Sequence, residues 1–525
     1  MPVSSLELVV AVGVAIVLCA GLARRFQIAP PVLFLIAGIL LGFVPMLRAV
    51  HLPPEAVLLL FLPVLLYWEG FTSSIRQIRR DLRVIALLAT ILVVLTAAGV
   101  AATAHAFGVP WGPAWVLGAA VAPTDATAVG VLGRMLPRRI GTLLRSESLV
   151  NDGTALVLYA LAVGVTIGAD HFTWGHLGLR FLISYGGGIV IGLAVTYVVL
   201  QVRRRLTDAF QHNLFAILTP LAAYLLAEAV EASGVLAVVV SGLWVGRKSP
   251  ELFPAFARQQ VRTVMDFVTT LANGALFVLT GLEAQSAVRG LSSVDLTTAI
   301  VLAAAVCVVI IGVRFGWLFT SPYLIRALDR RPAQRARRLS GPPRAVMATA
   351  GFRGAVSMAA ALSVPHTVAS GQPFPDRDLI IFVTSIVIAV TLLVQAPLLP
   401  RVVRWAGIGH DDSAAEERRR AEVTVLEEAL HALPAAAERL GTDEEVARHV
   451  RAEYDGHLRA LRGAGGAAPD GWQRQYADLQ LAVLAEKHKR LLRMHNDGEI
   501  DDEVLRGLQD TLDQEKIQAS RHRRT

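Results

Sequence analysis

Long apolar runs follow one another from Leu6 to about Trp405, and short polar segments separate them. A helix needs about 20 apolar residues to cross the hydrocarbon core of a bilayer, so the pattern predicts about 13 membrane-spanning helices. The predicted spans are residues 5–23, 30–47, 53–71, 82–107, 113–134, 140–168, 178–202, 211–231, 233–247, 261–283, 294–325, 343–367 and 376–403. We therefore expect an all-α polytopic membrane protein.

The end of the chain has a different pattern. Glu416 to Leu440 and Trp472 to Met494 carry apolar residues at helical spacing among mixed charges. We interpret residues 1–405 as a transmembrane domain and residues 406–525 as a helical cytoplasmic tail. The tail is either a solvated appendage or an element for regulation or dimer contact, and the sequence identifies no regulatory ligand for it.

Basic residues are concentrated in alternate connecting segments, which orients the predicted spans. These segments carry Arg24, Arg25, Arg76, Arg79, Arg80, Arg83, Arg134, Arg138, Arg139, Arg203, Arg204, Arg205, Arg247, Lys248, Arg258, Arg262 and the arginines between 326 and 344. Loops rich in Lys and Arg stay in the cytoplasm. With 13 spans the alternation is unbroken, which predicts a multi-pass plasma-membrane protein with its N-terminus outside and its C-terminus in the cytoplasm.

Composition excludes several other classes. The chain is 54% hydrophobic and only 18% charged, which is too apolar for a soluble protein of 525 residues. Its net charge of +8 is spread between apolar runs, so we expect no nucleic-acid partner; the expected partner is membrane lipid. The first run lacks a basic start and a cleavage site, so a removed signal peptide is not expected. Cys19 and Cys307 have no metal-ligand spacing, and we expect no cofactor.

Two predicted spans contain residues that interrupt helices. Pro123 precedes Thr124 and Asp125 in the fifth span, where the helix is expected either to open or only to kink. Gly351 and Gly354 flank Arg353 in the twelfth span. If spans 1–6 and 8–13 are inverted repeats, these two spans occupy equivalent positions. Interrupted spans at such positions indicate a transport site near the membrane midplane.

Charged groups in the sixth span indicate the chemistry. Ser148 and Asp152 share one helix face, Glu147 and Asn151 share a neighbouring face, and Asp152 is predicted to lie near the midplane. A buried carboxylate is either neutralised as a structural group or binds a small hard cation through oxygen ligands. Glu69 at the end of the third span is either an interfacial anchor or a third acid of the site.

Buried bases need partners as well. Arg353 is predicted to pair with Glu147 and to hold two helices together beside the site. Arg314 in the eleventh span is a second buried cation, for which the sequence indicates no partner.

The segments Ala122-Pro-Thr-Asp-Ala-Thr-Ala, Glu147-Ser-Leu-Val-Asn-Asp-Gly-Thr and Gly351-Phe-Arg-Gly-Ala-Val-Ser-Met resemble the signatures of the sodium/proton exchanger branch of the monovalent cation:proton antiporters. The resemblance extends over nearly the whole predicted membrane part. It implies a homodimer in which each protomer has a dimerisation domain and a core domain with two crossed, unwound helices.

The resemblance also implies roles for individual residues. Asp152 would carry either Na+ or H+. Thr124, Ser148, Asp125 and Glu69 would complete the cation shell. Asn151 would brace the helix crossing, and Glu147 with Arg353 would be a structural ion pair.

These roles predict a secondary active antiporter that exchanges Na+, or Li+ or K+, for H+ and serves pH homeostasis. Because Asn151 is neutral where an electrogenic branch has a second Asp, we expect one-for-one, electroneutral exchange. The alternatives are a cation channel or a K+-selective proton antiporter with the same residues. An intramembrane hydrolase would need a histidine base deep in a span, and His105 and His366 are both predicted near outer ends.

Overall fold

In the computed structural model, the structure describes residues 3–26, 29–45, 61–125, 136–168, 174–206, 208–291, 294–328, 341–408, 413–463 and 472–497, together with 508, 509, 512, 515 and 516. The chain divides into two compact units, Met1–Asp411 and Asp412–Thr525.

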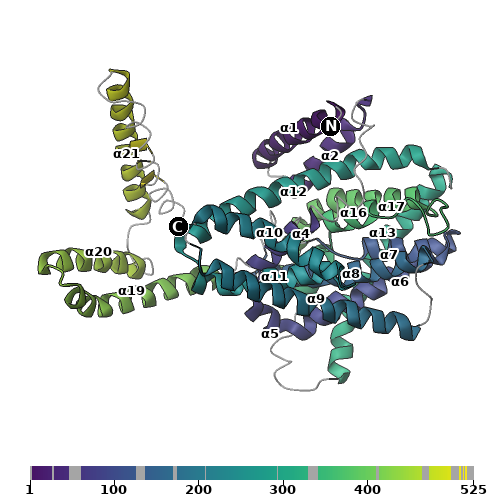
Figure 1. The fold of residues 1–525 in the computed structure, drawn as a ribbon, viewed down its shortest axis with the longest axis horizontal. Coiled ribbons are helices and arrows are strands. Elements are labelled where there is room, and N and C mark those ends of the chain that lie inside the picture. Colours follow the sequence, from purple (N-terminus) through teal and green to yellow (C-terminus); the bar gives the residue numbers. More distant parts are fainter. Residues whose placement is uncertain are drawn as a thin grey trace. The chain divides into compact units, whose positions relative to one another are not determined.

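The described part of the first unit is built from helices (Figure 1). They are α1 (Val3–Phe26), α2 (Pro30–Leu41), α4 (Leu62–Thr72), α5 (Ile75–Ala86), the π-helix η2 (Leu87–Leu92), α6 (Val93–Ala106), α7 (Trp111–Val121), α8 (Arg138–Thr166), α9 (Trp174–Arg203), α10 (Ala209–Glu228), α11 (Gly234–Leu252), α12 (Ala255–Gly290), α13 (Leu296–Leu328), α15 (Gly341–Thr349), α16 (Ala355–Leu362), α17 (Arg377–Val390), the π-helix η4 (Thr391–Gln395) and α18 (Ala396–Trp405). The predicted all-α fold is confirmed.

Local sequence explains where several helices begin. The side chain of Asp208 accepts a hydrogen bond from the amide of Phe210 at 3.2 Å and caps α10. The side chain of Ser233 accepts one from the amide of Leu236 at 3.2 Å and caps α11. Such side chains satisfy amides that have no partner inside a helix. At α2, Pro30 supplies no amide and has a backbone angle suited to a first turn.

Eight helices of the described residues are long and apolar enough to cross a membrane, and Pro30–Leu41 and Trp111–Val121 are shorter apolar helices. The total of 13 spans therefore stays a prediction, as does the inverted repeat. Part of the predicted third span and the end of the fifth lie outside the described residues. The fourth span differs from the prediction, because its helix already begins at Ile75 as the basic segment α5.

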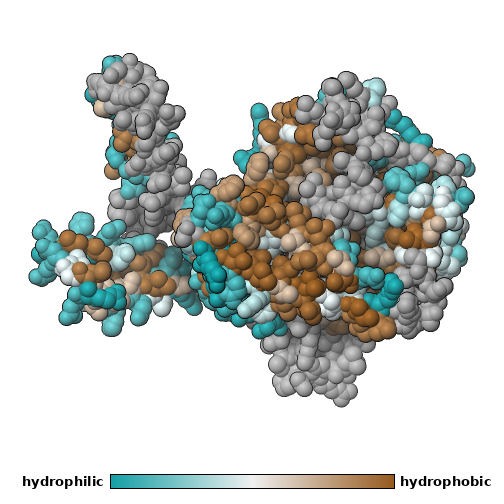
Figure 2. All heavy atoms as spheres, in the orientation of Figure 1, coloured by the Kyte–Doolittle hydropathy of each residue, from teal (hydrophilic) through white to brown (hydrophobic). Residues whose placement is uncertain are grey.

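Apolar side chains cover much of the first unit's surface. Figure 2 shows hydrophobic residues gathered over the face on which α9 and α10 lie. Helix α9 exposes Leu182, Val190 and Val198, and α10 exposes Phe210 and Leu225. A soluble protein rarely shows such a continuous apolar surface, whereas lipid tails provide a matching solvent for it.

Both predicted interruptions are present as non-helical backbone. Helix α7 ends at Val121, and residues 122–125 are not helical. Helices α15 and α16 are separated by residues 350–354, which are not helical either. The helix thus opens at Pro123 instead of only kinking there, and α8 packs against α7, α15 and α16.

The second unit contains α19 (Ser413–Leu440), α20 (Glu444–Gly463) and α21 (Trp472–Asn496). The spacing of apolar residues predicts α19 and α21 but not α20. Pairs such as Arg418 with Glu422 at 2.7 Å support α19 along its surface. Hydrogen bonds from the Arg419 and Arg420 side chains lower the pKa of Glu416 to about 2.

Candidate functional site

The two helix interruptions are joined to each other by hydrogen bonds. The amide of Asp125 donates to the carbonyl oxygen of Phe352 at 2.8 Å. The Asp125 carboxylate accepts a hydrogen bond from the amide of Ala355, the first residue of α16, at 3.2 Å. A carboxylate at this end of a helix is stabilised by the free amides and the helix dipole. Asp125 therefore ties the opened end of α7 to the start of α16.

Arg353 makes the complementary connection. Its guanidinium donates to the carbonyl oxygens of Val121 at 3.0 Å, Ala122 at 3.4 Å and Gly351 at 2.5 Å. Its amide donates to the hydroxyl oxygen of Thr391 at 3.2 Å. A cation near the C-terminal carbonyls of a helix compensates their partial negative charge. Arg353 thus satisfies backbone groups that are exposed where α7 and α15 end.

Gly354 is required by the close approach of Asp125. A Cβ atom at Gly354 would lie 1.6 Å from Oδ2 and 2.4 Å from Cγ of Asp125. We expect Gly354→Ala to displace this carboxylate and lower the free energy of unfolding by about 1–3 kcal/mol. Thermal unfolding of the purified protein measures the change. Gly312→Ala is the matched control because its Cβ would meet no atom within 4 Å. Equal stability of the two variants would contradict this packing.

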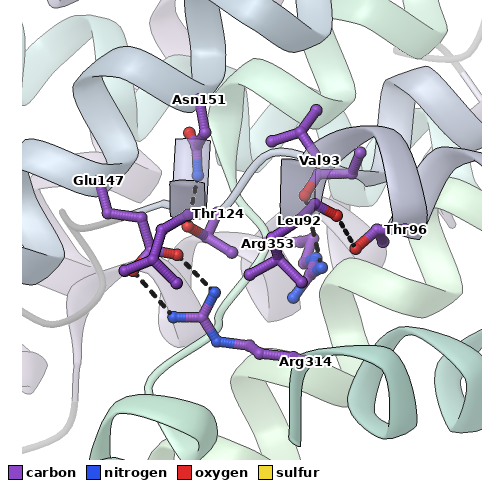
Figure 3. A pocket seen from close by; sticks show the side chains of 10 residues that line it. Leu92, Val93, Thr96, Thr124, Glu147, Asn151, Arg314 and Arg353 are labelled. Carbon is purple, nitrogen blue, oxygen red and sulfur yellow. Dashed lines mark hydrogen bonds and ion pairs between the residues drawn. The ribbon is translucent and has the colours of Figure 1, made fainter. Parts of the chain in front are cut away.

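Helix α8 places two polar side chains against the opened end of α7. Ser148 donates from its hydroxyl to the carbonyl oxygen of Thr124 at 2.8 Å. The Asn151 amide donates to the hydroxyl oxygen of Thr124 at 2.7 Å, as Figure 3 shows. Asp152 lies at the middle of this 29-residue helix and is 2% exposed. Thr124, Ser148 and Asn151 are buried as well.

Three acids predicted from the sequence share one electrostatic environment. The charge of Asp152 interacts with those of Glu69 and Asp125. Glu69 lies on α4 and also interacts with Arg145, an exposed residue of α8 that the sequence analysis did not single out. Like charges in a buried site repel one another, so a bound proton or cation stabilises this cluster of three carboxylates.

The atoms around Asp152 and Thr124 that could bind a cation are mainly oxygens. Among the residues that the structure describes, no group of three or more His, Cys, Asp or Glu side chains is arranged to hold a metal ion. The Oδ1 atom of Asn151 is buried and has no hydrogen-bond partner in the described part of the chain. Carboxylate, hydroxyl, amide and backbone oxygens suit hard cations rather than transition metals. The arrangement can therefore bind a hard monovalent cation or a proton.

The predicted ion pair of Glu147 with Arg353 was wrong. Glu147 pairs with Arg314 of α13, and the closest nitrogen–oxygen distance is 2.5 Å (Figure 3). Arg314 also donates to the carbonyl oxygen of Met347 at 3.0 and 3.2 Å. A Cβ atom at Gly351 would lie 2.5 Å from the Arg314 side chain, so a glycine admits the guanidinium here. Arg314 was noticed as a buried cation in the sequence, but its partner is set by the packing of α13 against α15.

Comparisons with known proteins find relatives over most of the chain. The sodium/hydrogen exchanger transmembrane family matches residues 13–405. The chain is 42% identical to an uncharacterized Na+/H+ exchanger of Mycobacterium tuberculosis over 522 residues, which cover 98% of this chain and 96% of that one. It is 26% identical to a sodium, potassium, lithium and rubidium/H+ antiporter of Bacillus subtilis, covering 97% of this chain and 78% of that one.

A solved structure has a similar fold. The sodium proton antiporter of Methanocaldococcus jannaschii at pH 8 matches with a TM-score of 0.59 and 19% identity. The match covers 76% of this chain and 99% of the archaeal one. At this identity the likeness concerns the fold.

Proposed function

The chain belongs to the sodium/hydrogen exchanger family, whose members are transporters and not enzymes, and from this premise we propose that it exchanges Na+ for H+ by way of Asp152. The carboxylate of Asp152 holds either ion, and the two ions compete for it. Thr124, Ser148 and Glu69 complete the Na+ shell, Asp125 acts on it through water, and Asn151 braces Thr124. We propose that Glu147 serves the architecture of the site through Arg314, and not the ion.

One observation carries this proposal. Asp152 is buried in the middle of a membrane-length helix and faces the same environment as two other carboxylates. The neighbouring backbone at Thr124 has left its helix and is bonded to Ser148 and Asn151. Non-helical backbone at membrane depth is tolerated where it lines a protein or water cavity, which is what an ion site requires.

Coupling follows from the cost of moving a bare charge. An unpaired carboxylate cannot pass an apolar barrier without a penalty of several kcal/mol, whereas a protonated or Na+-bound carboxylate is neutral. If the site changes its exposure only when it holds one of the two ions, each Na+ that moves one way requires one H+ to move the other way.

The transport assay uses purified protein in sealed vesicles with a pH-sensitive dye inside. Addition of NaCl, KCl and LiCl in turn, over several pH values, reports which cations drive proton movement. We expect Na+ to act at the lowest concentration. Discrete single-channel currents in a planar bilayer would contradict exchange and favour the cation channel, and preference for K+ would favour the potassium-selective antiporter.

Electroneutrality gives a separate prediction. Because Asn151 carries no charge, one Na+ is exchanged for one H+ and no net charge crosses the membrane. We expect Na+-driven proton flux to change less than about twofold when a potential of about 100 mV is imposed, which corresponds to about 2.3 kcal/mol for each charge moved. A potassium gradient with an ionophore sets the potential. A steep dependence of initial rate on voltage would exclude one-for-one exchange.

We further propose a homodimer in the plasma membrane that serves pH homeostasis, with the N-terminus outside and a tail from about residue 406 in the cytoplasm. Arginine bias in alternate loops supports this orientation. Labelling of introduced cysteines with reagents applied to one or the other side of the membrane tests the orientation, and chemical cross-linking in membranes tests the dimer.

A further inference from the structure

A basic cavity lies away from the candidate ion site, where α4 meets α5 beside the end of α11. Its volume is about 420 Å³. The lining includes the hydroxyl side chains of Ser73 and Ser74 and the guanidinium side chains of Arg76, Arg79 and Arg247. No carboxylate is among the described residues that line it. The cavity therefore concentrates positive charge and guanidinium hydrogen-bond donors.

The arginines of this cavity have few partners. Arg76, Arg79 and Arg247 are exposed. Within the part of the chain that the structure describes, the side chains of Arg76 and Arg79 have neither a hydrogen bond nor an ion pair. Arg247 lies 5.5 Å from the ring of Trp244. Glu251, the acid nearest to Arg247 in the sequence, already binds Lys248 at 2.8 Å. Three neighbouring cations repel one another unless an anion lies between them.

Backbone amides at the start of α5 add further hydrogen-bond donors. Helix α5 begins at Ile75, so its first amides have no partners inside the helix. Ser74 accepts a hydrogen bond from the amide of Gln77 at 3.4 Å, which leaves earlier amides of this turn available. Amides at a helix start together with arginine forks are the donors that bind phosphate groups.

We propose that this cavity binds a phosphate-bearing anion. Phosphate oxygens match the planar guanidinium forks, and the anion removes the repulsion among the three arginines. A solvated basic surface that only orients the protein in its membrane would need neither a concave site nor convergence of residues from two separate helices.

The cavity is connected to α4, which carries Glu69. The hydroxyl of Ser73 donates to the carbonyl oxygen of Glu69 at 2.7 Å. Gly246, which also lines the cavity, approaches the carbonyl oxygen of Phe71 so closely that a Cβ atom would lie 2.2 Å from it. An anion held between α5 and α11 would thus fix the end of α4. This role goes beyond the ion exchange proposed above.

The test compares two triple variants of the full-length protein. In one, Arg76, Arg79 and Arg247 are replaced by Gln. In the matched control, Arg24, Arg25 and Arg205 are replaced by Gln; these are exposed arginines outside the cavity lining. Both variants lose the same charge, so a general effect of charge appears in both.

Two probes distinguish the source of the phosphate. The first is inorganic phosphate, titrated against chloride at equal ionic strength while the thermal unfolding of the detergent-solubilised protein is followed. The second is phosphatidylglycerol, whose retention on the protein is measured by native mass spectrometry against phosphatidylcholine. Stabilisation by the first indicates a free anion, and selective retention of the second indicates a lipid headgroup.

We expect the wild type and the control to respond to at least one probe. For the cavity variant, the half-saturating concentration is expected to rise by about tenfold or more, since charged hydrogen bonds are lost at partly exposed positions. Equal responses of the cavity variant and the control to both probes would overturn the proposal, as would the absence of any response in the wild type.

Discussion

Replacing Asp152 with Asn is expected to reduce Na+-driven proton flux to the background of protein-free vesicles. The amide has nearly the same shape but neither binds a proton in this pH range nor offers a negative charge to a cation. Asp152 is already buried, so the neutral side chain should not harm folding. Dye dequenching in vesicles measures the flux, and thermal unfolding with gel filtration measures the fold.

The control for this result is Asp266→Asn on α12. It makes the same chemical change in the same unit, at an exposed carboxylate that accepts a hydrogen bond from Trp68 at 2.9 Å. Asn can still accept that bond, and near wild-type exchange is expected. Asp152→Glu keeps the carboxylate and should retain some exchange with a changed half-saturating Na+ concentration. Persistent Na+/H+ exchange by a folded Asp152→Asn protein would refute the role of Asp152.

Removing one partner of the buried ion pair is expected to cause the largest loss of stability. The side chains of Arg314 and Glu147 are 3% and 1% exposed. Glu147→Gln leaves the Arg314 cation buried without its counter-charge, which costs about 3–5 kcal/mol of unfolding free energy. The double variant Glu147→Gln with Arg314→Met removes both charges and should be more stable than either single loss would suggest. Unfolding in SDS mixed micelles measures each free energy.

The variants at 147 and 314 form one double-mutant cycle. A second double-mutant cycle, with variants at 147 and 353, distinguishes the ion pair in the structure from the one predicted by the sequence. Arg353 donates to backbone carbonyls, so Arg353→Met should destabilise the protein largely independently of Glu147. The interaction energy between changes at 147 and 314 should therefore exceed that between changes at 147 and 353. The reverse order would mean that Arg353 is the true partner of Glu147.

The partner of Glu147 could not be predicted from the sequence. A buried Glu must have a cationic partner, and the sequence offers two buried arginines on different helices. Their distances to Glu147 depend on how α13 and α15 pack against α8, and helix packing is a three-dimensional property. The same holds for Gly354. A glycine at this position indicates a weak point in a helix, but only the packing of the two interruptions against each other shows that the Asp125 carboxylate occupies the space of a side chain.

Several features were nonetheless determined by the sequence alone. Apolar runs of membrane length dictate helices, because a backbone in lipid must satisfy its own hydrogen bonds. Pro123 and the glycines at 351 and 354 located both interruptions, since local chemistry disfavours a helix there. Asp152 stood out because a carboxylate is costly in an apolar helix.

Tertiary structure decided which of these local features meet. It joined the two interruptions through Asp125 and Arg353, placed Thr124 against Ser148 and Asn151, and gave Glu147 its partner. It also brought the arginines of α5 and α11 around one cavity. The physical reason is that helix formation and membrane insertion depend on neighbours along the chain, whereas a binding site depends on contacts between distant residues, which the packing of helices alone sets.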